Sequence, residues 1–227
     1  MSNEGSQRPL YIAQISIHGL VRGTDLELGR DADTGGQVQY VIDLSRRLAM
    51  HPEVDRVDLF TRQILDAKVS PDYAVPEEEL GPGAQIIRLP CGPRRYFRKE
   101  VLWPYLDTFV DQLIGHVRAI GRTPDVVHGH YADGGYVGSR VAGLLGVPFI
   151  YTGHSLGRVK RRYLLEQGRD AERIDAYFHL PERIEAEEEA LDAAAAVVTS
   201  TQHEIDNQYV LYDHYKTGRK VVIPPGT

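Results

Sequence analysis

Gly29-Arg30-Asp31-Ala32-Asp33-Thr34-Gly35-Gly36-Gln37 lies between an apolar run and an amphipathic run of the chain. The run before it, Leu10-Tyr11-Ile12-Ala13-Gln14-Ile15-Ser16, is typical of a buried strand. After it, apolar residues recur at helical spacing: Val38, Val41, Ile42, Leu44, Leu48 and Ala49. The stretch is therefore predicted to turn the chain from a strand into a helix, with Asp33 or Thr34 as the helix cap.

The paired glycines in this turn allow two interpretations. Free N–H groups and the positive end of the helix dipole make such a turn a seat for a phosphate or another oxygen-rich ligand. Gly35 and Gly36 would let the backbone approach that ligand closely. Alternatively, the pair simply reverses the chain. The other segments of the sequence bear on this choice.

Strand-like runs alternate with helical stretches over the rest of the chain. Further strands are predicted at Val57–Thr61, Gln85–Leu89, Asp125–His130, Pro148–Thr152, Ala196–Ser200 and Lys220–Ile223. Further helices are predicted at Leu102–Ile120, Tyr136–Leu145, Glu182–Ala195 and Gln202–Tyr215. The polar span from Asp66 to Ala84 is expected to be a long surface excursion. This alternation indicates an α/β fold: a doubly wound, mostly parallel, Rossmann-like sheet with helices on both faces.

Length and composition are those of an ordinary globular protein. The chain has 227 residues, of which 42% are hydrophobic and 26% charged, and its net charge of −6 disfavours general nucleic-acid binding. A single cysteine, Cys91, excludes an intrachain disulfide and fits a reducing compartment. The start has no apolar signal core, and no run is long enough to span a bilayer. We therefore expect a cytoplasmic protein with residues 1–8 as a flexible leader.

Polar and glycine-rich segments follow four of the predicted strands. In an open parallel sheet, ligands bind beyond the carboxyl ends of the strands. The segments that would meet at that edge are Ser16–Gly19, His128–Gly135, Thr152–Gly157 and Thr199–Gln202. The sequence therefore predicts a polar ligand site at this edge, which favours the ligand-binding interpretation of the Gly-rich turn.

Motifs for metals and nucleotides are weak or missing. Asp31–Gly36 opens like a calcium loop, but Ile42 stands where a carboxylate should close the calcium shell. His128 and His130 share one face of a strand; without a supporting ligand set, we expect them to hydrogen-bond at the site rather than to bind a metal. The patterns GxGxxG, GxxxxGK[ST] and GxSxG do not occur. No metal and no cofactor are expected.

Two groups of basic residues lie near the predicted ligand edge: Arg94, Arg95, Arg98 and Lys99, and then Arg158, Lys160, Arg161 and Arg162. On an acidic protein such groups suggest a small anion such as a sugar phosphate, and a solvated charged face is the alternative. The glutamates from Glu182 to Glu189 are expected on a helix surface. Arg183 and Glu187 are four residues apart and are expected to pair there.

Several of these segments resemble the sucrose-phosphate synthase family. They are Ile15–Gly23, Glu27–Gln37, His130–Tyr136, Thr152–Arg161, Arg183–Glu188 and Val222–Gly226, and the resemblance runs from about Pro9 to Thr227. It implies a retaining GT-B glycosyltransferase of the family 4 type. Such enzymes move glucose from a nucleotide sugar, usually UDP-glucose, to carbon 2 of fructose 6-phosphate.

The resemblance also implies a domain organisation. GT-B enzymes have two Rossmann-like domains, and residues 9–227 correspond to the amino-terminal, acceptor-binding one. The donor-binding domain would then lie in cis beyond this chain or on a separate chain. This chain alone is expected to be inactive.

The same resemblance implies roles for individual residues. Gly35, Gly36 and Gln37 would lie against the acceptor and the donor phosphates. The contacts to fructose 6-phosphate would come from Lys99, Tyr131, Asp133, Ser155, Lys160 and Arg183. His154 would meet the transferred glucose, and Asp133 would also orient the acceptor. Glu182 departs from the family, in which a second basic residue often precedes the one matching Arg183.

Retention without an enzyme nucleophile would follow if the leaving diphosphate helps to deprotonate the attacking hydroxyl on the same face of the sugar. The protein would then supply positioning and charge stabilisation. We expect no buried carboxylate to act as a glycosyl nucleophile. Two alternatives stay open: a sucrose synthase, which would use free fructose, and a non-catalytic domain that binds sugar phosphate or docks on a donor-domain chain. The Ser155 and Lys160 pairing favours a phosphorylated acceptor.

Overall fold

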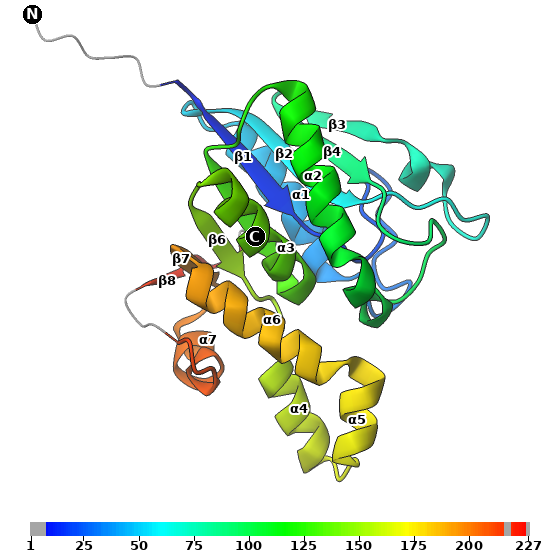
Figure 1. Ribbon diagram of the computed structural model, residues 1–227, viewed down its shortest axis with the longest axis vertical. Helices are drawn as coiled ribbons and strands as arrows, with labels where there is room; N and C mark the ends of the chain where they lie inside the picture. The colour runs from blue at the N-terminus through cyan, green and yellow to red at the C-terminus, as the bar shows by residue number, and fades with distance from the viewer. Residues whose placement is uncertain (1–7, 216–218, 226–227) are drawn as a thin grey trace, which may run out of the picture.

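A single sheet forms the centre of the protein (Figure 1). The computed structural model describes residues 8–215 and 219–225, and within them the sheet has eight strands in the order β3-β4-β2-β1-β5-β6-β7-β8. These are β1 (Leu10–Ile15), β2 (Val54–Arg62), β3 (Glu77–Gly81), β4 (Ala84–Leu89), β5 (Val126–His130), β6 (Phe149–Thr152), β7 (Ala196–Thr199) and β8 (Lys220–Val222). All neighbours are parallel except β3 and β4. The predicted doubly wound, mostly parallel sheet is confirmed.

The direction in which the chain builds the sheet reverses between β1 and β5. From β1 the chain adds β2 and β4 on one side, and it then adds β5, β6, β7 and β8 on the other. Ile12 of β1 is in register with Val57 of β2 and with Val126 of β5. Connections leave β1 and β5 in opposite directions, so the carboxyl ends of these two strands mark the switch point where ligands bind in such sheets.

Helices cover both faces of the sheet (Figure 1). They are α1 (Gly36–Ala49), α2 (Leu106–Ile120), α3 (Tyr131–Leu145), α4 (Gly157–Glu166), α5 (Ala171–Phe178), α6 (Leu180–Ala193) and α7 (Gln202–Asn207), with 3-10 turns at Pro71–Ala74, Lys99–Val101, Trp103–Tyr105 and Tyr209–Leu211. Helix α1 packs its apolar stripe on Ile12 and its neighbours. Helices α2, α3 and α6 pack on the opposite face, around Ile15 and Phe60. Alternation along β1 therefore supplies both cores.

The structure differs from the predicted elements where the sequence is polar. The span from Asp66 to Ala84 contains β3, an antiparallel edge strand rich in glutamate, because charged residues suit an exposed strand edge. Helices α4 and α5 were not predicted; α4 begins in a run of basic residues and α5 has only eight residues. The predicted helix at Gln202–Tyr215 ends at Asn207 and continues as a short 3-10 turn.

Helix α3 begins at Tyr131, five residues earlier than predicted. Gly134 and Gly135 suggested a loop, but they let the helix lie close to the sheet. A Cβ on Gly134 would stand 2.6 Å from the carbonyl oxygen of Ile15, and one on Gly135 would stand 2.6 Å from the ring of Tyr151. These two glycines therefore serve packing.

Parts of three predictions lie outside the described residues: the leader except for Arg8, Gly226 at the end of the last motif, and residues 216–218 and 226–227 of the predicted domain. Within the described ranges, none of the helices combines the length and the apolar character needed to cross a bilayer.

Candidate functional site

The Gly-rich turn is held by side chains that the sequence suggested as helix caps. Asp33 forms an ion pair with the Lys99 ammonium and accepts a hydrogen bond of 2.8 Å from the Lys99 N–H. Thr34 Oγ1 accepts from the N–H of Leu20 at 3.2 Å. The predicted capping by Asp33 or Thr34 is wrong, because both side chains tie the turn to other loops. Gly35 is the N-cap and no side chain caps α1, so its first N–H groups keep their capacity to bind an anion.

Gly35 and Gly36 border open space. A Cβ added to either would meet nothing within 4 Å, and neither has a positive φ. The fold itself therefore does not require glycine at these two positions. Beside them, Gln37 Nε2 donates to Ser16 Oγ at 3.2 Å, which ties the start of α1 to the end of β1.

The ends of β1 and β5 bring His18 and Asp133 together. His18 Nδ1 lies 2.8 Å from Asp133 Oδ2, and both side chains are buried. The other carboxylate oxygen of Asp133 accepts from the Gly134 N–H at 2.7 Å. The His18 ring packs edge-on against Tyr131, with 4.6 Å between ring centroids. Asp133 is thus held on the first turn of α3 at the switch point of the sheet.

Three further histidines lie beside this pair. His128 Nε2 is 2.8 Å from Thr152 Oγ1, and His130 Nδ1 is 3.0 Å from His154 Nε2. Burial lowers the pKa of His128 to about 4 and, together with the neighbouring histidines, holds the pKa of His130 well below its usual range. Among the described residues, no group of three or more His, Cys, Asp or Glu side chains is arranged to hold a metal ion. These imidazoles are neutral at pH 7 and act as hydrogen-bonding groups.

His154 is exposed at the end of β6, yet many protein atoms surround its ring. Desolvation by these atoms, and after it the charges that His128 and His18 would carry, lower the pKa of His154 to about 3. Its ring also packs edge-on against Tyr40 of α1, with 5.0 Å between centroids. His154 therefore presents a neutral imidazole between the ends of β6 and α1.

Two of these residues have strained backbones. Tyr131 has a φ of 65° and His154 a φ of 55°, in the left-handed region that bulky side chains rarely occupy. Such conformations cost about 1–3 kcal/mol and concentrate at ligand sites. Both strained residues follow strands that end at the switch-point edge.

Two cations lie over the Tyr131 ring, and a third, Lys160, interacts electrostatically with both. The Arg183 guanidinium carbon lies 4.5 Å and Lys99 Nζ 6.0 Å from the ring centroid. Lys160 Nζ lies 3.6 Å from the Phe178 ring centroid. Burial, followed by the charges of Arg183 and Lys99, lowers the pKa of Lys160 to about 8. Lys99 and Arg183 each pair with a carboxylate, Asp33 and Glu187, but the positive charge near Lys160 still lowers its pKa, so a bound anion would be stabilised there.

Arg183 is fixed by two neighbours. Its Nη2 donates to the Ser155 carbonyl at 2.6 Å and lies 3.3 Å from Ser155 Oγ, and its Nε donates to Glu187 at 2.9 Å. Arg183 and Glu187 pair as predicted, but both side chains are buried. The expectation that Glu187 lies on a helix surface is wrong, because α4 and the segment after α7 cover that side of α6.

Comparison of the sequence with protein families assigns most of the chain to one family. The family model described as glycosyl transferase 4-like domain matches residues 35–226. The chain belongs to the glycosyl transferase 4-like domain family.

This glycosyl transferase 4-like domain is similar to sucrose-phosphate synthases. It is 46% identical over 272 residues to probable sucrose-phosphate synthase 1 of Oryza sativa subsp. indica, covering 99% of this chain and 25% of that protein. Sucrose-phosphate synthase 4 of Arabidopsis thaliana is 47% identical over 267 residues, with 99% and 25% covered. The solved sucrose-phosphate synthase of Thermosynechococcus elongatus aligns with a TM-score of 0.74 at 28% identity, covering 96% of this chain and 48% of that one.

These comparisons confirm the resemblance to sucrose-phosphate synthases and the fold of the amino-terminal half of a GT-B glycosyltransferase. The chain spans about a quarter of the length of the curated relatives that it matches.

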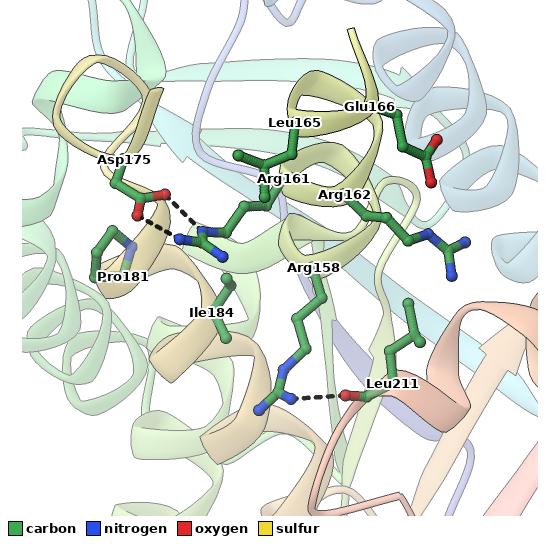
Figure 2. A pocket seen from close by; sticks show the side chains of 9 residues that line it. All are labelled: Arg158, Arg161, Arg162, Leu165, Glu166, Asp175, Pro181, Ile184 and Leu211. Carbon is green, nitrogen blue, oxygen red and sulfur yellow. Dashed lines mark hydrogen bonds and ion pairs between the residues drawn. The ribbon is translucent and has the colours of Figure 1, made fainter. Parts of the chain in front are cut away.

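Only some residues of the two predicted basic groups lie at this site of the glycosyl transferase 4-like domain. Arg98 contacts Tyr177 instead of the Tyr131 region. Figure 2 shows Arg161 paired with Asp175 and Arg158 bonded to the Leu211 carbonyl, beside a hollow of about 640 Å³. Because a helix turns about 100° per residue, Lys160 points to the opposite side of α4. The basic groups therefore divide between the site and structural ion pairs.

Sequence reasoning missed several residues of this site. His18 directly follows β1, so the rule that ligands bind at strand ends pointed to its segment, but it was not named as a site residue. Asp33 and Tyr40 lie in or near the Gly-rich turn without a motif of their own. Tyr212 carries no signal in the sequence, because its role depends on packing against α6.

Two carboxylates are buried at this site. Asp133 and Glu187 are 2% and 0% exposed. The oxygens of both have hydrogen-bond partners. Asp133 bonds to His18 and the Gly134 N–H. Glu187 accepts from Arg183, the Gly157 N–H and the Tyr212 hydroxyl. The sequence could not reveal them because burial of a charge depends on partners far away in the chain.

Proposed function

We propose that this chain is the acceptor-binding domain of a sucrose-phosphate synthase-like enzyme, within residues 9–227. It would bind fructose 6-phosphate, and a donor-binding domain in cis or on a separate chain would supply glucose from UDP-glucose. The observation that carries this proposal is that Lys99 and Arg183 lie over the Tyr131 ring, which packs against His18 of the His18–Asp133 pair. Lys160 is near enough to both cations for their charges to lower its pKa. The proposed setting is cytoplasmic, with no cofactor.

The phosphate of the acceptor would bind to the three cations. Arg183 Nη1 has no hydrogen-bond partner within residues 8–215 and 219–225, so it is available to a phosphate oxygen. Lys160 Nζ lies over a ring and not against a carboxylate, which leaves its donors for the same ligand. Lys99 would exchange part of its contact with Asp33 for the phosphate. Charge-assisted hydrogen bonds of this kind are the stronger ones.

The sugar ring would lie toward the switch point. Asp133, fixed by His18 and by the Gly134 N–H, would accept a hydrogen bond from an acceptor hydroxyl and orient it. The open backbone at Gly35 and Gly36, with Gln37 beside it, would lie against the acceptor and the donor phosphates. Neutral His154 would hydrogen-bond the transferred glucose without acting as a charged acid.

Retention of configuration would rest on the leaving diphosphate, which would take the proton of the attacking hydroxyl on the same face of the sugar. Glu187 is unsuited to nucleophilic attack because donors occupy both of its oxygens. Asp133 would orient the acceptor hydroxyl and would not attack the sugar. The protein then contributes position and positive charge to the transition state.

Titration calorimetry with fructose 6-phosphate, with fructose as the comparison ligand, tests the proposal on this chain. We expect saturable binding of the phosphate ester and at least ~10-fold weaker binding of fructose, the equivalent of about 1.4 kcal/mol. Lys160→Ala should remove most of this preference. Arg162→Ala, on the opposite side of α4, should retain it.

Equal affinity for the two sugars would favour a sucrose synthase-like domain instead. Tight binding of fructose 6-phosphate without transfer, even with a donor domain added, would favour a non-catalytic sugar-phosphate module. Absence of binding to either sugar would contradict the acceptor-domain proposal.

A further inference from the structure

Glu187 pairs with Arg183, one of the three cations, and is completely buried. Its Oε1 accepts from Arg183 Nε at 2.9 Å and from the Gly157 N–H at 3.0 Å. Its Oε2 accepts from the Gly157 N–H at 2.8 Å and from the Tyr212 hydroxyl. Every donor comes from a different part of the fold: α6 itself, the first residue of α4, and the segment after the Tyr209–Leu211 turn.

Glu187 and Tyr212 together accept the first two N–H groups of α4. Glu187 takes the Gly157 N–H, and the Tyr212 oxygen accepts the next N–H, that of Arg158, at 3.1 Å. The cap residue of α4, Leu156, offers no side-chain acceptor. A carboxylate is favourable at a helix N-terminus because of the helix dipole. The first two amides of α4 are therefore closed to a phosphate, and anion recognition at the start of this helix falls to side chains.

The same carboxylate fixes the orientation of Arg183. With Nε bonded to Glu187 and Nη2 bonded to Ser155, the guanidinium plane is held on two sides beside Tyr131. The remaining donors on Nη1 then point in one direction. Because Glu187 also accepts the N–H of Gly157, the first residue of α4, the position of Lys160, three residues further along that helix, depends on the same contacts. A site held in this way loses little side-chain freedom when a ligand binds.

We propose that Glu187 is a positioning residue that makes this site specific for a phosphorylated acceptor, by holding Arg183 and the start of α4 in one arrangement. The inference rests on the proposed function, because it assigns Glu187 to the recognition of the acceptor phosphate. Tyr212 supports the same arrangement, because its hydroxyl donates to Glu187 and accepts from the Arg158 N–H.

The test compares the ratio of the dissociation constants for fructose and fructose 6-phosphate in wild type and variants. Glu187→Gln keeps the shape of the side chain but removes the charge that holds Arg183, and its amide NH₂ opposes one of the existing donors. We expect the preference for the phosphate ester to fall at least ~10-fold, with fructose affinity unchanged, since one charged hydrogen bond is lost. Tyr212→Phe removes a single hydrogen bond and should lower the preference several-fold in a folded protein.

Glu188→Gln is the matched control. Glu188 is the next residue on α6 but pairs with Arg158 and His214, outside the phosphate site. Its preference for the phosphate ester should equal that of wild type. Glu187→Asp, which keeps the charge, should restore part of the preference lost in Glu187→Gln.

The outcomes separate this inference from the proposed function. If wild type shows no preference for the phosphate ester, the proposed function fails. If wild type prefers the ester, and Glu187→Gln and Tyr212→Phe lower the melting temperature but keep the full preference, Glu187 is only structural and the inference is overturned. If Glu187→Gln does not fold, the preference of Tyr212→Phe decides the question.

Discussion

Lys160 is the residue whose ionisation responds most directly to the proposed ligand. Burial, then the charges of Arg183 and Lys99, lower its pKa from 10.5 to about 8. The side chain is therefore protonated at pH 7 and loses its charge as the pH rises through 8. A phosphate monoester is mostly dianionic above about pH 6. Affinity for fructose 6-phosphate should thus be highest near pH 7 and fall above about pH 8, because the tighter-binding form of Lys160 is the protonated one.

Calorimetry between about pH 6.5 and 9.5 measures this profile. In Lys160→Arg the guanidinium keeps its charge throughout, so the alkaline decline should flatten even if the affinity at pH 7 is lower. A decline of the same size in Lys160→Arg would show that another group is responsible.

Single residues also show where prediction from sequence stops. The resemblance named Lys99, Tyr131, Ser155, Lys160 and Arg183, and the structure brings four of them into contact through the Tyr131 ring and Arg183. The fifth, Lys160, contacts Phe178 and feels the charges of Arg183 and Lys99. Their roles toward a ligand stay predictions. The partners that hold them could not be read from the sequence, because pairs such as Asp33 with Lys99 join residues that are 66 positions apart. Such pairs depend on how the loops pack and not on local pattern.

At the scale of elements, helix α3 depends on glycines that look like ligand-loop residues in the sequence. A Cβ on Gly134 would lie 2.6 Å from the backbone oxygen of Ile15, which cannot move without disturbing β1. Gly134→Ala should therefore destabilise the protein by about 2–3 kcal/mol through overpacking. Gly143→Ala, in the same helix but with nothing within 4 Å, should stabilise it by up to about 1 kcal/mol, because alanine is the better helix former.

Urea unfolding at pH 7.5 checks both values. Equal effects of the two substitutions would mean that helix propensity alone, and not the close approach of α3 to β1, controls stability here.

Strands were easier to predict than helices in this fold for a physical reason. Central parallel strands such as β1, β5 and β6 are covered on one or both faces, so they read as short apolar runs. Helices α4 and α5 project from the sheet and pack mainly against α6 and each other (Figure 1). They are short, and α4 begins in a run of basic residues. The start of α4 therefore looked like part of a basic loop, although it carries Lys160.

On the scale of the whole molecule, the topology explains why separate motifs form one site. Chain reversal between β1 and β5 places the segments after these strands at one edge, with the segment after β6 beside them. This edge could be predicted, because parallel sheets place all strand ends together. The hydrogen bonds of Glu187 could not be predicted, because Glu187 and Tyr212 become neighbours only when the segment after α7 covers α6.

The buried histidines at the same edge link the site to the stability of the entire fold. Burial lowers the pKa of His128 from 6.5 to about 4, and the pKa of His130 is also lowered. Between about pH 6.5 and 4 the unfolded chain therefore binds more protons than the folded one, so the free energy of unfolding falls as the pH falls through this window. For His128 alone a full shift of that size corresponds to ~3 kcal/mol.

Urea unfolding of the wild type at about pH 7.5, 6 and 4.5 measures this loss. His128→Gln should lower stability at pH 7.5 through its lost bond to Thr152 but should show a shallower decline toward acid, because one buried proton acceptor is gone. His51→Gln, at an exposed turn, should reproduce the wild-type slope. If His128→Gln keeps the full slope, carboxylates and not these imidazoles control the acid stability.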